Sequence, residues 1–398
     1  MDNANAGVVR ASVNRWRRLA VVGMSVWLVA PAHAAPSETA RKVHITSSRP
    51  ATRSQAHVAP VAPERPHEGD FVLRDFRFAS GETLPELRLH WLTLGRPARD
   101  AQGGITNAVL ILHGTSGSGR QFLAPQFAHE LYGPGAPLDT TRYYLVLPDG
   151  IGHGRSSKPS DGLHMRFPAY GYADMVEAQR RLLVEGLGVR HLRLVMGTSM
   201  GGMHTFVWGV THPGMMDALM PLACQPVAIV GRNRVWRAML MDAIRSDPDW
   251  QGGEYASPPV RALRTATDLL LLAGSAPVPM QAALATRDSA DRWLARETAR
   301  RMAALDANDL LYQVAASADY DPSAQLAAIT APLVWINSAD DFINPPELGI
   351  AEREVQRIRD ARLVMLPADE QGHGHGSHTW AARWKQHLAA LLESTAAR

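Results

Sequence analysis

The segment G-T-S-M-G at residues 197–201 places a serine hydroxyl where it can act as a nucleophile. It follows the apolar run 192–196 and precedes a segment with helical spacing, which predicts a sharp turn from strand to helix with Ser199 at its tip. The flanking glycines avoid clashes in so tight a turn, and the start of the helix favours negative charge beside the serine. The competing interpretation is a purely structural turn, because glycine and serine are common residues.

A serine hydroxyl needs an adjacent base and a third group that orients the base. With this kind of turn the chain order is serine, acid, histidine, so the acid is expected after the next-to-last apolar strand. Asp340 and Asp341 both follow the apolar run 333–336. We favour Asp341, which stands four residues before Pro345, and we interpret Asp340 as a residue that caps the turn.

Three histidines, His373, His375 and His378, follow the last apolar strand. The base must come from a loop before the final helix, and His378 already fits the pattern of that helix. We therefore favour His375 and keep His373 and His378 as alternatives. Together with Asp369 these histidines could hold zinc, but the sequence has no other clear ligand group around them, and we expect no metal site.

An oxyanion hole needs two backbone N–H donors beside the nucleophile. Met200, the next residue after the serine, is expected to supply one of them. The glycine-rich segment H-G-T-S-G-S-G at 113–119 follows another apolar strand, and Thr115 is expected to supply the second. The segment lacks the G-K-S/T ending of a phosphate-binding loop, which argues against nucleotide binding.

Short apolar runs that alternate with helical patterns indicate a parallel sheet with helices on both faces. The runs lie at 108–112, 143–147, 192–196, 333–336 and 363–366, and helical spacing is found at 172–186 and 378–393. The alternating segments 71–78 and 87–94 predict an antiparallel hairpin. Residues 226–325 are rich in helical patterns, and they predict an insertion that covers the carboxyl ends of the strands as a lid.

The first 34 residues predict a secretory signal peptide. Arginines at positions 15, 17 and 18 precede the apolar run 19–29, and small residues precede a cleavage point after Ala34. Residues 35–68 have no apolar periodicity and predict a flexible linker. The folded domain is then expected over residues 69–398, in a secreted or periplasmic protein with no stable membrane insertion after cleavage.

Composition and charge exclude several other classes of protein. Four arginines against one aspartate in residues 1–34 account for the whole formal charge of +3, so the remaining chain is close to neutral. A nucleic-acid partner would require a basic stripe on the folded part, and the sequence shows none. Cys224 is the only cysteine, which excludes an intramolecular disulfide and a cysteine-rich metal site.

Several segments resemble the homoserine O-acetyltransferases, a branch of the α/β-hydrolase fold. The similar segments are 133–143, 199–203 and the part of the helical insertion at 243–255, and residues 341–346 and 374–375 fall where that family has its acid and base. The resemblance implies a mostly parallel eight-stranded sheet with helices on both faces and a helical lid insertion. It also implies a small-molecule acyl substrate and a homodimer formed through the lid; we expect no cofactor.

The chain departs from this family at two places. The loop 148–157 is closer to that of a general hydrolase than to the Asn-containing loop of these transferases. The position where the resemblance implies a substrate-reading arginine, counted back from Asp247, holds Met241. The arginines near enough to replace it are Arg232, Arg234, Arg237 and Arg245.

We therefore expect a secreted serine hydrolase that cleaves an ester-type small acyl substrate through an acyl-enzyme intermediate. The alternative is an O-acyltransferase that passes the acyl group to a small alcohol, as the family resemblance implies. Both begin with the same half-reaction, but export would separate the protein from cytosolic acetyl-CoA, and Met241 and the altered loop also favour the hydrolase. A third interpretation, a binding module without activity, conflicts with the intact candidate triad.

Overall fold

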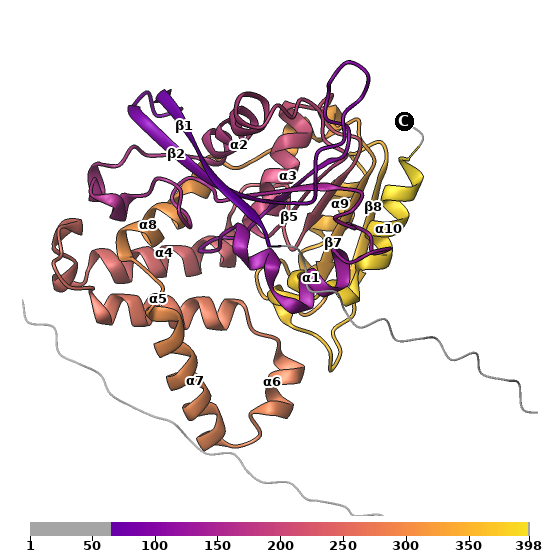
Figure 1. The fold of residues 1–398 in the computed structure, drawn as a ribbon. Coiled ribbons are helices and arrows are strands. Elements are labelled where there is room, and N and C mark those ends of the chain that lie inside the picture. The colour runs from indigo at the N-terminus through magenta and orange to yellow at the C-terminus, as the bar shows by residue number, and fades with distance from the viewer. Residues whose placement is uncertain (1–64, 397–398) are drawn as a thin grey trace, which may run out of the picture. The chain divides into compact units, whose positions relative to one another are not determined.

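The computed structural model describes residues 65–396, which form a single sheet and the helices around it (Figure 1). The predicted signal peptide and nearly all of the predicted linker lie outside the described residues. The first strand begins at His67, two residues before the predicted start of the domain. Among the described residues, no helix has both the length and the apolar character that crossing a membrane requires.

The described part of the chain contains an eight-stranded sheet with the spatial order β1-β2-β4-β3-β5-β6-β7-β8. Strand β2 is antiparallel to β1 and β4, and the other neighbouring strands are parallel. This confirms the mostly parallel eight-stranded sheet and the antiparallel hairpin. The strands are β1 (His67–Arg77), β2 (Thr83–Leu94), β3 (Ala108–Leu112), β4 (Tyr144–Pro148), β5 (Leu194–Thr198), β6 (Leu219–Leu222), β7 (Leu333–Ser338) and β8 (Ala361–Leu366).

Helices cover both faces of the sheet. One face packs against α1 (Pro125–Leu131) and α10 (Lys385–Ser394), and the other against α2 (Tyr172–Arg181), α3 (Met200–Thr211) and α9 (Ile350–Val355). Within β3, Val109 packs on the side of α1 and α10 and Leu110 on the side of α2, α3 and α9, and both are fully buried. Burial on two sides explains why the central strands are continuously apolar rather than alternating.

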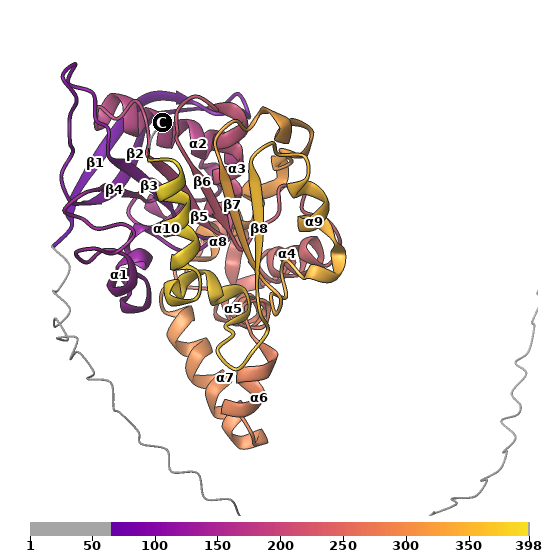
Figure 2. The same ribbon diagram turned by 90° about the vertical axis from the view of Figure 1, so that its right-hand side faces the viewer.

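Between β6 and β7 the chain forms a helical segment with an apolar core of its own. Its α-helices are α4 (Gly231–Arg245), α5 (Val260–Ala273), α6 (Pro277–Ala283), α7 (Arg287–Met302) and α8 (Ala307–Ala315). In Figure 1 and in Figure 2, α5, α6 and α7 lie together and project away from the sheet. The helical character expected of residues 226–325 is therefore present, while their action as a lid stays a prediction.

The C-terminal helix is shorter than its spacing predicts. It begins at Lys385, whereas Gly374–Thr379 and Ala381–Arg383 form separate 3-10 turns. The expectation that His378 belongs to the final helix is therefore wrong. Trp380 and Trp384 both have non-helical backbone angles, and Trp384 is fully buried against the sheet. Burial of a large indole here outweighs the local preference for a continuous helix.

Candidate active site

Ser199 lies at a strained turn between β5 and α3. Its φ of 55° and ψ of −114° are unusual for a residue with a side chain, and its N–H donates to Leu222 O at 2.8 Å. A Cβ on Gly197 would collide with the Gly201 backbone, and a Cβ on Gly201 would collide with the Leu112 carbonyl. Both glycines of the motif are thus required by close backbone approach, which holds the serine at the carboxyl edge of the sheet.

His375 reaches Ser199 from the other end of the chain. The Ser199 hydroxyl donates to His375 Nε2 at 2.8 Å, and the His375 side chain is 11% exposed. The histidine lies in the 3-10 turn after β8, where Gly374 has a φ of 56° and its N–H donates to Asp340 Oδ2 at 3.0 Å. Asp340 therefore fixes the loop that carries the histidine.

Asp341, rather than Asp340, faces the imidazole. It follows β7, and its buried Oδ2 accepts a hydrogen bond from His375 Nδ1 at 2.9 Å. Burial alone would raise the pKa of Asp341, but His375 and the amides of Asn344 and Ile343 outweigh it and lower that pKa. A carboxylate that stays ionised can orient the imidazole and stabilise its protonated form.

The two alternative histidines occupy other positions. His373 stacks on Trp380 with ring centroids 3.9 Å apart. The His378 ring lies 5.4 Å from the His375 ring, and burial together with the neighbouring His375 lowers the pKa of His378 to about 3. Within residues 65–396, no cluster of three or more histidine, cysteine or acidic side chains is arranged to hold a metal ion.

Both residues expected to form an oxyanion hole lie near the serine. Met200 is the first residue of α3, so its N–H has no acceptor within the helix. Thr115 follows Gly114, where a Cβ would come 3.3 Å from the Ser199 Cβ. The loop that carries Thr115 is anchored to the loop after β4, because Gly150 N–H donates a hydrogen bond to His113 Nε2 at 2.9 Å.

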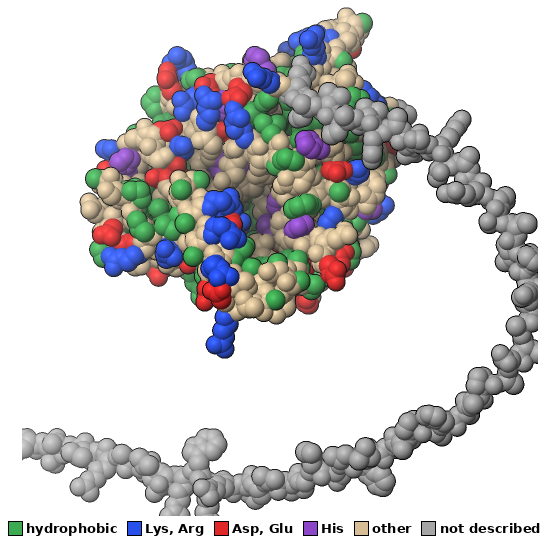
Figure 3. Space-filling view, turned by 60° about the horizontal axis from the view of Figure 1, so that its bottom comes forward, with side chains coloured by type: hydrophobic (Ala, Val, Ile, Leu, Met, Phe, Trp, Pro, Cys, Tyr) green, Lys and Arg blue, Asp and Glu red, His purple; other side chains and the backbone are tan. Residues whose placement is uncertain are grey.

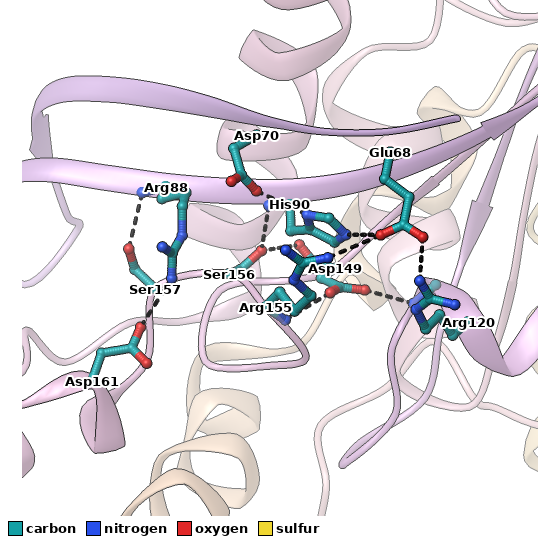
Figure 4. A network of polar contacts seen from close by, with 11 residues as sticks. Glu68, Asp70, Arg88, His90, Arg120, Asp149, Arg155, Ser156, Ser157 and Asp161 are labelled. Carbon is teal, nitrogen blue, oxygen red and sulfur yellow. Dashed lines mark hydrogen bonds and ion pairs between the residues drawn. The ribbon is translucent and has the colours of Figure 1, made fainter. Parts of the chain in front are cut away.

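A network of charged groups joins this loop to the hairpin (Figure 4). Glu68 on β1 accepts hydrogen bonds from Arg120, in the 3-10 turn that follows β3, and from Arg155, in the loop after β4. The buried Asp149 accepts from the N–H groups of Gly119 and Arg155 at 2.7 and 2.8 Å. These contacts connect the expected oxyanion loop to β1 and to the loop after β4.

Three buried histidines lie beneath the site and were not identified from the sequence. They are His113, His153 and His204, and each is at most 3% exposed. Burial is the largest cause of a lowered pKa in all three, and it brings the pKa of His204 to about 3. All three are therefore neutral at pH 7 and act as hydrogen-bonding core residues.

Of the four arginines near Met241, Arg237 is the buried one. Its Nε donates to Asn233 Oδ1 at 3.0 Å and its Nη1 to Ser317 Oγ at 3.3 Å, and among the described residues it forms no ion pair. Burial raises the pKa of the Tyr172 hydroxyl, which has no well-formed hydrogen bond among the described residues, and the nearby Arg237, Ser317 and Thr115 act against that rise. A buried guanidinium that has the Trp236 ring beside it but no anionic partner within residues 65–396 thus lies near the expected oxyanion loop.

A cavity of about 780 Å³ lies between the acid loop, α9 and the start of α4. Its lining is largely apolar and includes Met203, which is one helical turn after the serine, together with Arg232, Phe342 and Leu348. The volume is in the range of small-molecule sites. Figure 3 shows a hollow on the face turned toward the viewer, with histidine side chains in its wall and cationic side chains at its rim.

The chain matches the family described as alpha/beta hydrolase fold over residues 107–368. A probable acyltransferase from Methanothermobacter thermautotrophicus is 32% identical over 307 residues, which cover 76% of this chain and 91% of that protein. A homoserine O-acetyltransferase from Thermobifida fusca is 37% identical over 194 residues, which cover 45% of this chain and 50% of that protein.

Solved structures show the same fold at lower identity. The homoserine O-acetyltransferase from Bacillus anthracis has a TM-score of 0.72 at 21% identity, covering 83% of this chain and 98% of its own. An acetylester hydrolase from Corynebacterium glutamicum has a TM-score of 0.71 at 22% identity, covering 82% of this chain and 96% of its own. The fold is thus shared by proteins named for acyl transfer and for ester hydrolysis.

Proposed function

The chain belongs to the α/β-hydrolase family and is a hydrolase or an O-acyltransferase, and from this premise we propose that it is a serine hydrolase of small esters. The hydrogen-bonded series from Ser199 to His375 to Asp341 is the observation that carries the proposal. Its geometry is that of a nucleophile, its base and the group that orients the base.

In the first half-reaction the Ser199 oxygen attacks the ester carbonyl while His375 Nε2 takes the hydroxyl proton. The N–H groups of Met200 and Thr115 stabilise the negative charge that develops on the carbonyl oxygen. When the ester bond breaks, His375 returns the proton to the alcohol oxygen, and the acyl group remains on Ser199. Asp341 stabilises the imidazolium in both steps without taking up the proton.

In the second half-reaction water repeats the sequence on the acyl-enzyme. His375 removes a proton from water as its oxygen bonds to the acyl carbon, and the bond to Ser199 then breaks with return of the proton to the serine. The products are a carboxylic acid and the free enzyme. The apolar cavity beside the acid loop is large enough for a small acyl or alcohol group, and Asp341 is the member of the triad that lines it.

We propose that the enzyme acts outside the cytosol, because of the segment that precedes the described residues. Its order of basic, apolar and small residues supports export and cleavage after Ala34. An exported enzyme meets little acyl-CoA, whereas water is available in every compartment, which favours hydrolysis over transfer. Expression of the full chain followed by N-terminal sequencing of the secreted or periplasmic protein tests this part; a mature protein that still begins at Met1 would contradict it.

Removal of the serine hydroxyl tests the chemistry. Ser199→Ala should lower kcat/KM for p-nitrophenyl acetate by about a thousandfold or more, because the nucleophile is lost while the oxyanion donors remain. Ser338→Ala is a matched control, since Ser338 is also buried at the carboxyl end of a strand and its hydroxyl has no partner among the described residues. Near-normal turnover by Ser199→Ala would contradict the proposed triad.

The second candidate is an O-acyltransferase whose acceptor carries a carboxylate, and Arg237 is the observation that favours it. A buried guanidinium without an anion is costly, and a substrate carboxylate would supply the missing charge. Such a bond contributes about 1.5–3 kcal/mol, or roughly a 10- to 150-fold preference for carboxylate-bearing substrates. Acetyl-CoA with homoserine is the assay suggested by the relatives, with CoA release as the readout.

The two candidates predict different dependence on the acceptor. Transfer requires CoA release that rises with homoserine and is lost in Arg237→Met, whereas hydrolysis releases product at a rate independent of homoserine. Arg245→Met is the control, because Arg245 is exposed near the end of α4. If the rate of product release depends neither on homoserine nor on Arg237, the chain is a hydrolase.

A further inference from the structure

The Asp341 carboxylate is held by four hydrogen-bond donors. Oδ2 accepts from His375 Nδ1 and from Asn344 Nδ2, both at 2.9 Å. Oδ1 accepts from the backbone N–H groups of Ile343 at 2.7 Å and of Asn344 at 3.2 Å. The oxygen that faces the imidazole is therefore shared with one other side chain, that of Asn344.

The orientation of the Asn344 amide follows from its two acceptors. Besides Asp341 Oδ2, Nδ2 donates to Ala223 O at 3.0 Å, so a reversed amide would bring Oδ1 against two oxygens. The residue is 1% exposed, and among the described residues its Oδ1 has no hydrogen-bond partner. A buried oxygen without a donor is unfavourable, and a purely structural position is better filled by an apolar side chain.

The second contact of Asn344 ties the acid loop to the strand beside the nucleophile. Ala223 directly follows β6, has a φ of 53°, and donates its N–H to Ile336 O in β7 at 2.8 Å. The preceding residue, Leu222, accepts the N–H of Ser199. A short series of hydrogen bonds and one peptide link thus runs from Asp341 through Asn344 to the backbone of the serine.

We infer that Asn344 is a positioning residue, whose amide keeps Asp341 Oδ2 in line with His375 Nδ1 by anchoring the carboxylate to the end of β6. The inference rests on the proposed function, because it requires His375 to act as the base. Asn344 does not touch the reacting atoms and acts only through Asp341. The same amide also helps to lower the pKa of Asp341.

Asn344→Leu keeps a similar volume and removes the donor. We expect kcat for p-nitrophenyl acetate to fall about 10- to 100-fold with KM within about threefold, because a misplaced base slows the chemical steps more than binding. The acid limb of the kcat/KM profile should move to higher pH. A carboxylate with one donor fewer is more basic, so it stabilises the protonated imidazole of His375 more strongly. The other titratable groups that face Asp341, His378 and Cys224, are unchanged by this variant.

Proton NMR gives a readout that a structural role would not move. The proton between His375 Nδ1 and Asp341 Oδ2 should resonate far downfield, and its position should change in Asn344→Leu. Asn308→Leu is the matched control. Asn308 lies on α8, is 2% exposed, and forms hydrogen bonds through both ends of its amide, to Trp250 and to Gly253. That variant should lose stability but keep kcat, the pH profile and the downfield resonance.

Asn344→Ser provides a second variant if Asn344→Leu does not fold, and it should show a smaller loss of kcat in the same direction. A folded Asn344 variant with kcat within twofold of wild type and an unchanged pH profile would overturn the inference. If Ser199→Ala keeps its activity, the proposed function itself fails. If Ser199→Ala is inactive and the Asn344 variants behave as wild type, only the positioning role fails.

Discussion

At the scale of single residues, the region of the nucleophile contains imidazoles in two different environments. The His375 side chain is 11% exposed and has a hydroxyl on one side and a carboxylate on the other. His113, His153 and His204 lie beneath the sheet edge, where burial keeps them neutral. The first arrangement suits proton transfer, while the second makes the folded state sensitive to acid.

The free energy of unfolding should fall as the pH drops below 6.5. The histidines of the unfolded chain then take up protons, whereas burial keeps the pKa of His204 in the folded protein at about 3. Between these two values the unfolded state binds more protons, so acid destabilises the fold. His204→Phe should reduce the slope of the free energy of unfolding against pH by up to about 1.4 kcal/mol per pH unit. Urea titrations at pH 7, 6 and 5 measure it.

An exposed histidine provides the comparison for this measurement. His191 lies at the surface, where it pairs with Asp217, and His191→Gln is the comparison variant because it retains all three buried imidazoles. The prediction concerns the slope and not the absolute stability, because His204→Phe also removes a contact with Gln179. Equal slopes for His204→Phe and wild type would show that the buried imidazole contributes nothing to acid sensitivity.

At the scale of elements, the turn from β5 to α3 depends on glycine. Gly201→Ala should destabilise the protein by about 1–3 kcal/mol, because its Cβ would collide with the Leu112 carbonyl and force the strands or the helix apart. The shift of Ser199 should also lower kcat by about a hundredfold. Thermal melts and p-nitrophenyl acetate turnover measure the two effects.

Gly214 offers a matched control just after α3. A Cβ there meets no atom within 4 Å, so Gly214→Ala should be neutral or slightly stabilising. The prediction fails if the two alanine variants unfold at the same temperature, since both substitutions reduce the freedom of the unfolded chain equally.

Much of this element order could be predicted because apolar runs and chain order leave few choices. They restricted the site to one serine, two aspartates and three histidines, and the structure brings Ser199, Asp341 and His375 together. Strand β6 was not recognised from its own residues, because it has four residues and includes Pro221. It becomes a strand only through its pairing with β5 and β7.

Side chains that act through distant partners could not be predicted in this way. Asn344 follows Asp341 by three residues, and this local spacing could have suggested a turn, but its bond to Ala223 joins residues 121 positions apart. Likewise, four arginines were equivalent in sequence, and only the packing of α4 against the 3-10 turn that carries Ser317 shows which of them is buried. Such contacts depend on tertiary structure alone.

At the scale of the whole described molecule, the hairpin β1–β2 extends the sheet and is joined to the active-site loops by Glu68. Glu68→Gln should lower the free energy of unfolding by about 1 kcal/mol at low salt, because it weakens two bonds to arginines that are more than half exposed. The difference should shrink in 1 M NaCl, where exposed charges are screened. Urea titrations at both salt concentrations measure it.

Glu86→Gln serves as its control within the same hairpin. Glu86 pairs with Arg74, and both side chains are at least 60% exposed, so little stability depends on them. A loss in Glu68→Gln no larger than in Glu86→Gln, or one that persists in high salt, would show that the network of Figure 4 does not secure the hairpin electrostatically.

Covalent labelling of the intact protein by a fluorophosphonate ester measures most directly whether Ser199 is an activated nucleophile. The hydrogen bonds among Ser199, His375 and Asp341 predict one adduct per chain, on the peptide that contains Ser199. Ser199→Ala should remain unlabelled, and His375→Ala should react far more slowly. Folded wild-type protein that gains no adduct, or gains it on another residue, would contradict the proposed triad.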